Sequence, residues 1–104
     1  MGAPIRIRAK LADGKADVRV LMSHPMESGA RKDTTGKLVP ALYITDVSAT
    51  LNGSRTVLSA QWGVAVSQDP FLWFRFGGAK AGDKLAITWK DNTGDTRTDE
   101  IALA

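Results

Sequence analysis

The stretch "YITDVSATLNGSRTVLSAQW", residues 43–62, decides the predicted fold, because it has the pattern of two strands joined by a tight turn. Apolar side chains recur at every second position in 47–51 and again in 58–62. A period of two is typical of a strand with one buried face. Asn52-Gly53 accepts the positive φ angles of a tight hairpin turn, so this segment predicts a β-hairpin.

Five further segments have strand-like patterns and are separated by turns rich in Gly, Pro, Asn and Asp. They are residues 1–10, 16–22, 70–76, 84–90 and 96–103. No window of a dozen residues has a helical repeat with caps. About seven short antiparallel strands therefore predict an all-β fold, an immunoglobulin-like β-sandwich without the disulfide and tyrosine corner of antibody domains.

Length and composition predict a single domain that spans residues 1–104. The 43% hydrophobic and 24% charged shares are those of an ordinary globular protein, and no run of residues predicts a membrane span. The start of the chain, "MGAPIRIRAK", alternates isoleucine with arginine and lacks the apolar run of a signal peptide. Because the chain has no cysteine, it can form neither a disulfide nor a covalent thiol intermediate.

The charge balance raises the question of a nucleic-acid partner. The net charge is +3 and the pI is about 9.5, but fourteen cations and eleven anions are interspersed along the chain. This spacing predicts a solvated surface of mixed charge rather than a basic patch. The aromatic stretch 71–76 also lacks the basic-Gly-aromatic opening of an RNA-recognition strand. We therefore expect no nucleic acid among the partners.

The segment "PFLWFRF", residues 70–76, is apolar on both faces. A sandwich buries one face of each strand, so the outer face of this strand needs a second cover. That cover is either the loop at 23–41 or a protein partner, and the polarity of the loop favours the partner. The predicted partner-binding residues are Phe71, Trp73 and Phe74, with Trp62 and Tyr43 as secondary anchors.

The segment "LMSHPMESGARKD", residues 21–33, holds the only histidine of the chain. If it is extended, Met22, His24 and Met26 point one way and offer soft ligands for Cu(I). This spacing supports a rival hypothesis, a small periplasmic copper-binding β-sandwich. A copper or zinc site usually needs more histidine or cysteine ligands, so a core position for Met22 and a backbone hydrogen bond for His24 are the favoured interpretation.

The sequence offers little support for a catalytic site. His24 with Ser23, Ser28 or Glu27 has the residue types of a nucleophilic site, but side chains so close together on one loop rarely point at one another. The carboxylates Asp91 with Asp95 and Asp99 with Glu100 lie in or beside a predicted turn with no histidine expected nearby, so we expect them to be solvated. The glycines of "FGGAKAGDK" lack the setting of a phosphate loop. We expect no enzyme activity, metal or cofactor.

Several of these stretches together resemble the SoxZ family, the smaller subunit of the SoxYZ carrier complex of bacterial thiosulfate oxidation. They are "VLMSHPMESGARKD", "GKLVPALYI", "SAQWGVAVSQDPF" and "TWKDNTGD". The resemblance covers nearly the whole chain, and its most specific part is Ser23–Asp33. One departure is Asp69-Pro70, where the family pattern leads us to expect Asn-Pro.

The resemblance implies a non-catalytic subunit that forms a heterodimer with SoxY. In that family SoxY has a glycine-rich arm ending near a cysteine, which carries the sulfur intermediates. It also implies transient docking to other Sox enzymes and a periplasmic location, reached without a signal peptide of its own by export with the folded partner. Whether the isolated chain is a monomer or forms a homodimer through the partner-binding face is left open by the sequence.

For the loop at 23–33 the resemblance favours a recognition surface near the carrier arm or the docking enzymes. The predicted docking residues are His24, Glu27, Arg31, Lys32 and Asp33. Their charges would set the orientation of encounter rather than its tightness. Arg31 and Lys32 would also steady an anionic sulfonate end of the cargo.

Overall fold

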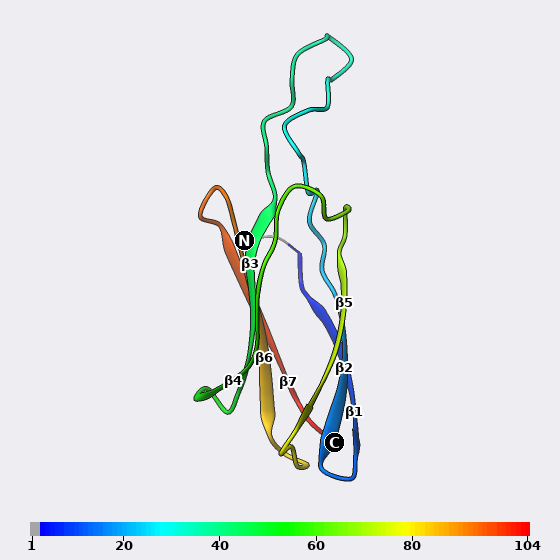
Figure 1. Ribbon diagram of the computed structural model, residues 1–104, viewed down its shortest axis with the longest axis vertical. Helices are drawn as coiled ribbons and strands as arrows, with labels where there is room; N and C mark the ends of the chain where they lie inside the picture. Colours follow the sequence, from blue (N-terminus) through cyan, green and yellow to red (C-terminus); the bar gives the residue numbers. More distant parts are fainter. Residues whose placement is uncertain (1–2) are drawn as a thin grey trace.

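The computed structural model describes residues 3–104, which form seven β-strands in two facing sheets (Figure 1). The strands are β1 (Arg6–Ala12), β2 (Lys15–Leu21), β3 (Ile44–Leu51), β4 (Arg55–Gln61), β5 (Phe71–Gly77), β6 (Lys84–Asp91) and β7 (Thr96–Ala102). This confirms the predicted all-β sandwich. Met1 and Gly2, which open the predicted first strand, lie outside the described residues.

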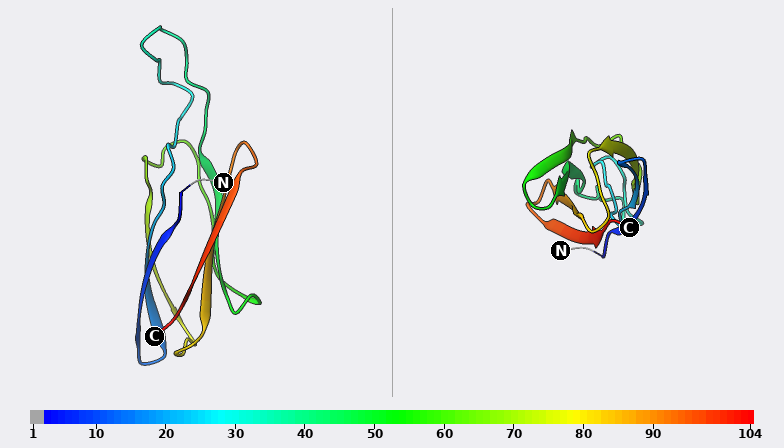
Figure 2. Two further views of the ribbon diagram at one scale, coloured as in Figure 1. Left: turned by 180° about the vertical axis from the view of Figure 1, so that it is seen from behind. Right: turned by 90° about the horizontal axis from the view of Figure 1, so that it is seen from below.

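The sheets have the strand orders β1-β2-β5 and β4-β3-β6-β7, and every paired strand is antiparallel. This is an immunoglobulin-like order in which the fourth strand joins the sheet of β3, β6 and β7. Strands β1 and β7 approach each other along one side of the sandwich. Strands β4 and β5 are the edge strands on the other side, as the views from behind and below show (Figure 2).

The predicted Asn-Gly turn connects β3 and β4. Asn52 and Gly53 have φ angles of 53° and 71°, in the left-handed region that asparagine and glycine adopt most readily. Asp13 and Gly14 have φ angles of 54° and 73° and turn β1 directly into β2. The residue types of these turns therefore set the two hairpins.

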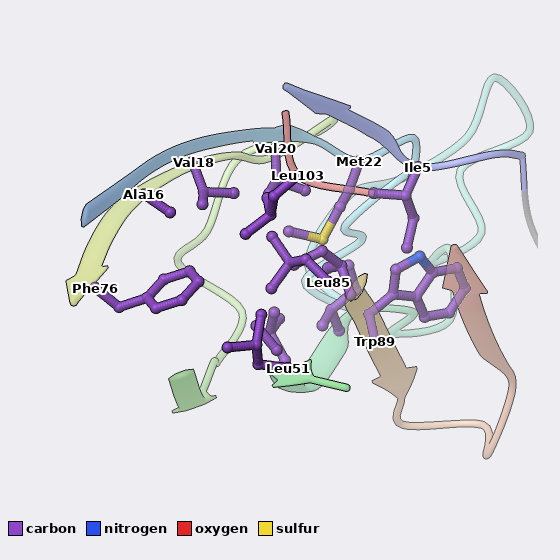
Figure 3. Packing of buried hydrophobic residues seen from close by; sticks show 14 of the residues in the cluster. Ile5, Ala16, Val18, Val20, Met22, Leu51, Phe76, Leu85, Trp89 and Leu103 are labelled. Atoms are coloured by element: carbon purple, nitrogen blue, oxygen red, sulfur yellow. The ribbon is translucent and has the colours of Figure 1, made fainter. Parts of the chain in front are cut away.

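The core lies between the sheets and is built from alternate residues of the strands (Figure 3). Val18 and Val20 of β2 face Leu85 and Trp89 of β6 across the sandwich, and all four are almost fully buried. Met22 directly follows β2 and is also buried, as the favoured interpretation predicted. Burial of one face per strand, at roughly 25 cal/mol per Å² of apolar surface, stabilises the pairing of the two sheets.

The molecule is elongated because the chain between β2 and β3 projects from one end of the sandwich (Figure 1). Its principal extents are 54 × 20 × 20 Å and its radius of gyration is 15.5 Å, against about 13 Å expected for a compact chain of this length. We call residues 27–42 the arm. Two isolated bridges hold its limbs together, Glu27 with Leu42 and Lys32 with Leu38.

Leu85→Ala tests the core. Leu85 is fully buried, so the change leaves a cavity and should lower the free energy of unfolding by about 2–5 kcal/mol. For a chain of this size that corresponds to a fall in Tm of roughly 10 °C or more, measured by circular dichroism. Leu38→Ala, at a 60% exposed site on the arm, is the control and should change stability by about 0.5 kcal/mol or less. Equal effects of the two changes would contradict the proposed core.

Candidate functional site

Strand β5 exposes aromatic side chains on the outer face of its sheet. Phe71 and Trp73 are 60% and 52% exposed, while Phe76, on the opposite face, is buried. Leu21 lies directly across from Phe71 on β2 and is also exposed. The outer pair is therefore uncovered within the described residues, and the loop at 23–41 does not fold over it, because its arm projects away from the sandwich (Figure 1).

The Trp73 ring is held in place by charged neighbours. Its Nε1 donates to Asp17 Oδ1 at 2.9 Å, and the guanidinium carbons of Arg19 and Arg75 lie 4.7 and 5.3 Å from its centroid. The Arg75 Nε donates to Asp17 Oδ2 at 2.8 Å, which is the main reason that the pKa of Asp17 is lowered. Such stacking positions an exposed tryptophan without burying it.

The other three predicted contact residues lie elsewhere. Phe74 points inward, half-buried, and stacks on Phe76 with centroids 6.2 Å apart. Tyr43 precedes β3 and Trp62 follows β4, and both are half-buried against the core. The five residues therefore do not form one patch on the outer face: Phe71 and Trp73 share it, and the remaining three are partly used by the core.

One side chain that the sequence analysis missed links the two edge strands. Arg55, at the start of β4, donates from Nη1 to the carbonyl oxygen of Gly78 at 3.4 Å, and its guanidinium carbon lies 5.9 Å from the Phe76 ring centroid. Gly78 has a φ of +72°, and a Cβ there would lie 2.8 Å from Arg55 Nη1. This contact joins the start of β4 to the residue that follows β5. Because the two residues are far apart in the sequence, no local pattern predicts it.

The arm is held by its own hydrogen bonds. Glu27 and Leu42 exchange two backbone bonds of 2.6 and 2.9 Å, and further out Val39 N donates to the Arg31 carbonyl at 2.8 Å. At the tip, Asp33 Oδ1 accepts bonds from Thr35 N, Thr35 Oγ1 and Lys37 N. These bonds, first of all the one from the Thr35 hydroxyl, lower the pKa of Asp33. The loop predicted from the sequence is thus a narrow two-limbed projection.

Most charges of the predicted docking loop are already used within the arm. Arg31 donates to both carboxylate oxygens of Glu27, at 3.0 and 2.8 Å from Nε, and this bond is the main cause that lowers the pKa of Glu27. Asp33 shapes the tip. Lys32 is exposed and makes no ion pair among the described residues. Lys32 is therefore the docking residue whose charge is free.

His24 lies in the interior, away from the surface at which the sequence analysis placed it. The residue is only 4% exposed, and its Nε2 lies 3.2 Å from Asp91 Oδ2. Its Nδ1 accepts a bond from Met26 N at 3.1 Å, which confirms the predicted backbone hydrogen bond of His24, so Nε2 is the nitrogen that donates to Asp91. The ring also lies edge-on to Trp89, with centroids 5.0 Å apart. His24 thus anchors the base of the arm and presents no side chain to a partner.

The expectation that Asp91 is solvated and has no histidine nearby is wrong. Asp91, the last residue of β6, is 4% exposed and accepts bonds from Thr93 N, Thr93 Oγ1 and Asp95 N as well as from His24. Burial acts to raise its pKa, but the bonds from Thr93 and His24 outweigh it, and the pKa lies below the ordinary value. Residues 67 positions apart form this pair, so sequence spacing does not reveal it.

Ligands for the copper hypothesis are close together but occupied. Met22 and Met26 are both buried, and Met26 Sδ accepts a bond from Ile44 N at 3.3 Å. Both ring nitrogens of His24 have partners as well. Among residues 3–104 no three His, Asp or Glu side chains gather as ligands. Binding Cu(I) through Met26 and one ring nitrogen of His24 would compete with two hydrogen bonds in the interior.

The catalytic set drawn from the loop is not brought together. The His24 ring contacts Asp91, Glu27 pairs with Arg31, and Ser28 Oγ accepts a bond from Ala30 N at 3.2 Å. Asp69, the departure from the family pattern, has a φ of 51° and accepts the His24 N–H on Oδ1 at 3.1 Å. An asparagine carbonyl would accept the same bond, so aspartate preserves the contact that the turn needs.

A hollow of about 570 Å³ lies at the base of the arm. Pro25, Arg31 and Leu42 line it together with Gln68 and Thr93, which come from other loops of the sandwich. None of the described residues forms a helix long and apolar enough to span a bilayer. The features that stand out from the sandwich are therefore the arm with this hollow and the exposed face of β5.

These features define an immunoglobulin-like β-sandwich protein with one uncovered aromatic edge strand and a self-braced arm. Residues 5–102 match the family model of the sulphur oxidation protein SoxZ, and the chain belongs to the SoxZ family. This confirms the resemblance found in the sequence. Among curated proteins, none matches the chain.

Asp91→Asn tests the anchor. Because the pKa of Asp91 is lower in the folded than in the unfolded chain, its carboxylate stabilises the fold above about pH 4, and this stabilisation is lost as the pH falls further. The amide oxygen can keep the three donors on Oδ1, but the amide NH2 then faces the donor Nε2 of His24 and the buried charge is lost, so we expect a loss of about 2–4 kcal/mol at pH 7. The loss should shrink at pH 3, as measured by urea unfolding.

Glu100→Gln is the matched control, since Glu100 is exposed on β7. It should change stability by no more than about 0.5 kcal/mol at either pH. A loss for Asp91→Asn that is the same at pH 7 and pH 3 would contradict a role for the charge of Asp91.

Proposed function

We propose that this chain is the non-catalytic subunit of a heterodimeric sulfur carrier and binds a cysteine-bearing, SoxY-like subunit. The observation that carries the proposal is the match of residues 5–102 to the SoxZ family. The sequence contains no cysteine, so a covalent sulfur intermediate of thiosulfate oxidation would be held on the partner. The chain then acts as one binding domain in the periplasm, exported together with its folded partner.

The exposed face of β5 supports this role. Edge strands with unpaired backbone and apolar side chains are usually covered, because they otherwise pair with other chains. Phe71 and Trp73 are large, exposed and partly pre-positioned, as residues that dominate protein interfaces are. We therefore place the carrier interface at the outer face of the β5 edge, with Phe74 in the core beneath it. Trp62 and Tyr43 lie at the ends of β4 and β3 in the other sheet and are not first contacts.

The arm is proposed as the docking element for the enzymes that act on the carried sulfur. It projects beyond the sandwich, and the residues from Arg31 to Leu38 are all exposed (Figure 1). The bridges of Glu27 with Leu42 and of Lys32 with Leu38 keep the limbs in register, and Arg31 pairs with Glu27 within one limb. The free charge of Lys32 is available to steer encounter. Lys32 is also the better placed of the two cations to meet an anionic sulfonate, because Arg31 already has a carboxylate.

Phe71→Ser with Trp73→Ser tests the carrier interface. Each aromatic at the centre of an interface typically contributes about 2–4 kcal/mol on truncation, so we expect the affinity for a SoxY-like subunit from the same cell to fall at least about 100-fold. Isothermal titration calorimetry of the two purified subunits measures this. Val64→Ser, at another exposed apolar residue, is the control and should leave the affinity within about threefold.

A complex unaffected by the double change would place the interface elsewhere and refute this assignment. Sedimentation of the isolated chain gives a second readout. If homodimers form through the same face, they should dissociate in the Phe71→Ser, Trp73→Ser variant and should be displaced by the SoxY-like subunit.

Arg31→Ala with Lys32→Ala tests the arm. We expect the assembled carrier to associate several-fold more slowly with an enzyme that acts on its cargo, most clearly at low salt, while the heterodimer itself stays intact. Stopped-flow fluorescence measures the rate. Lys84→Ala with Lys90→Ala removes the same net charge from β6 and should slow association less. Equal slowing by both pairs would assign the effect to net charge and not to the arm.

A further inference from the structure

The outer face of the three-stranded sheet collects the cations of three strands. Register places Arg8 beside Arg19 and Trp73, and Lys10 beside Asp17 and Arg75. The exposed cations of this outer face are Arg6, Arg8, Lys10, Lys15, Arg19 and Arg75. The only carboxylate that these strands add to the face is Asp17.

The charge of the chain is therefore segregated, contrary to the expected mixed surface. Six cations, Asp17 and Asp13 of the β1–β2 turn, which borders the hollow of this face, give it a formal charge of +4, whereas the whole chain carries +3. The remaining residues together carry −1. The expectation of evenly dispersed charge was wrong because alternate residues of a strand share one face, so cations separated by apolar residues in sequence become neighbours in space.

This charge is not neutralised within the chain. Asp17 pairs with Arg75 at 2.8 Å and lies 3.7 Å from Arg19. Arg8 and Lys15 make no ion pair among the described residues, and Arg8 lies directly opposite Arg19, where like charges are destabilising. All cations of this face except Arg6 border an open hollow of about 780 Å³, together with Asp13 and Asp17. An arrangement that weakens the fold locally has its most direct explanation in a ligand of opposite charge.

We propose that the outer face of β1, β2 and β5 is an electrostatic docking surface for an acidic protein. Its charge is complementary to a cluster of Asp and Glu side chains, which a face of formal charge +4 attracts over about a Debye length. The surface shares Trp73 with the proposed carrier interface and extends from there toward the end of the sandwich away from the arm. Arg8, Lys10, Lys15 and Arg75 therefore lie outside both the arm and the apolar end at Phe71. The inference goes beyond the carrier role and holds whichever chain covers Phe71.

The details of the face favour a protein over other polyanions. Asp17 lies in the middle of the cations and would repel a continuous phosphate backbone, whereas protein interfaces commonly mix both signs of charge. Trp73 between two arginines combines the two residue types most enriched at protein hot spots. The basic end has no exposed apolar row to enter a bilayer, because Ile7 and Leu11 of β1 point toward the core.

The experiment titrates the full ¹⁵N-labelled chain with a decaglutamate peptide and follows backbone amide shifts. We expect saturable shifts confined to β1, β2 and β5. Binding should weaken at least about tenfold when the salt concentration rises from about 20 to about 200 mM, because salt screens exposed charges. Arg8→Gln with Lys15→Gln removes two unpaired cations and leaves the Asp17 ion pairs intact. This variant should bind at least about tenfold more weakly.

Lys84→Gln with Lys90→Gln lowers the net charge equally on the other sheet and should weaken binding less than threefold. Equal weakening by the two pairs, or shifts spread over both sheets, would overturn the proposal. It would also be overturned if a 20-nucleotide single-stranded DNA or phosphatidylglycerol vesicles occupied this face more tightly than the peptide in the same buffer. Thermal unfolding of each variant confirms that a loss of binding is not a loss of fold.

Discussion

Strand β5 has apolar side chains on both faces, and the sandwich can cover only one of them. Phe76 and the inward Phe74 pack toward the core, which leaves Phe71 and Trp73 in water on an edge strand. The fold cannot relieve this by itself, because the segment long enough to fold over β5 forms hydrogen bonds within its own two limbs and projects away. The charged side chains around Trp73 hold its ring but do not bury it. Exposure of this edge is thus a property of the fold, and it is the feature that a binding role explains most directly.

A second constraint joins the arm to the sandwich. The arm departs from β2 through His24, and that side chain is fixed by groups from two distant loops: Asp91 on its ring and Asp69 on its backbone N–H. Without these contacts, an exposed two-limbed projection held by a few bonds would have little to set its direction, since such segments open locally at low free energy. The buried pair therefore lets the arm be long and polar while its base stays rigid. The residues of the stretch Ser23–Asp33 therefore differ in role. His24 is a buried anchor, Glu27 and Arg31 form an ion pair, and Lys32 carries a free charge.

Sequence reasoning predicted the strands well because their signals are local. The alternation around Asn52-Gly53 and from Ala16 to Met22 depends only on which side chains share a face, and that periodicity survives in the structure. The site was predicted less well because its contacts are not local. Asp91 was expected to be solvated, since its turn-like surroundings give no sign of a histidine 67 residues away. His24 was placed on the surface for the same reason, and the Arg55 contact with Gly78 between the two edges has no sequence signal at all.

The alternation of side chains along a strand makes a cluster of charges on one face difficult to recognise in the sequence. In β1 the residues from Arg6 to Lys10 alternate cation and apolar side chain, so the charges seem diluted along the chain, yet every cation falls on the same face. Pairing with β2 and β5 then adds Arg19 to the row of Arg8 and Arg75 to the row of Lys10. The interior requires the apolar half of this alternation, but it places no demand on the sign of the outer half. The fold therefore does not require six cations beside two carboxylates on this face, and the opposed arginines Arg8 and Arg19 lower its stability. The core does not constrain the sign of the charge on the outer face of this sheet. Selection for a partner can therefore act on that sign.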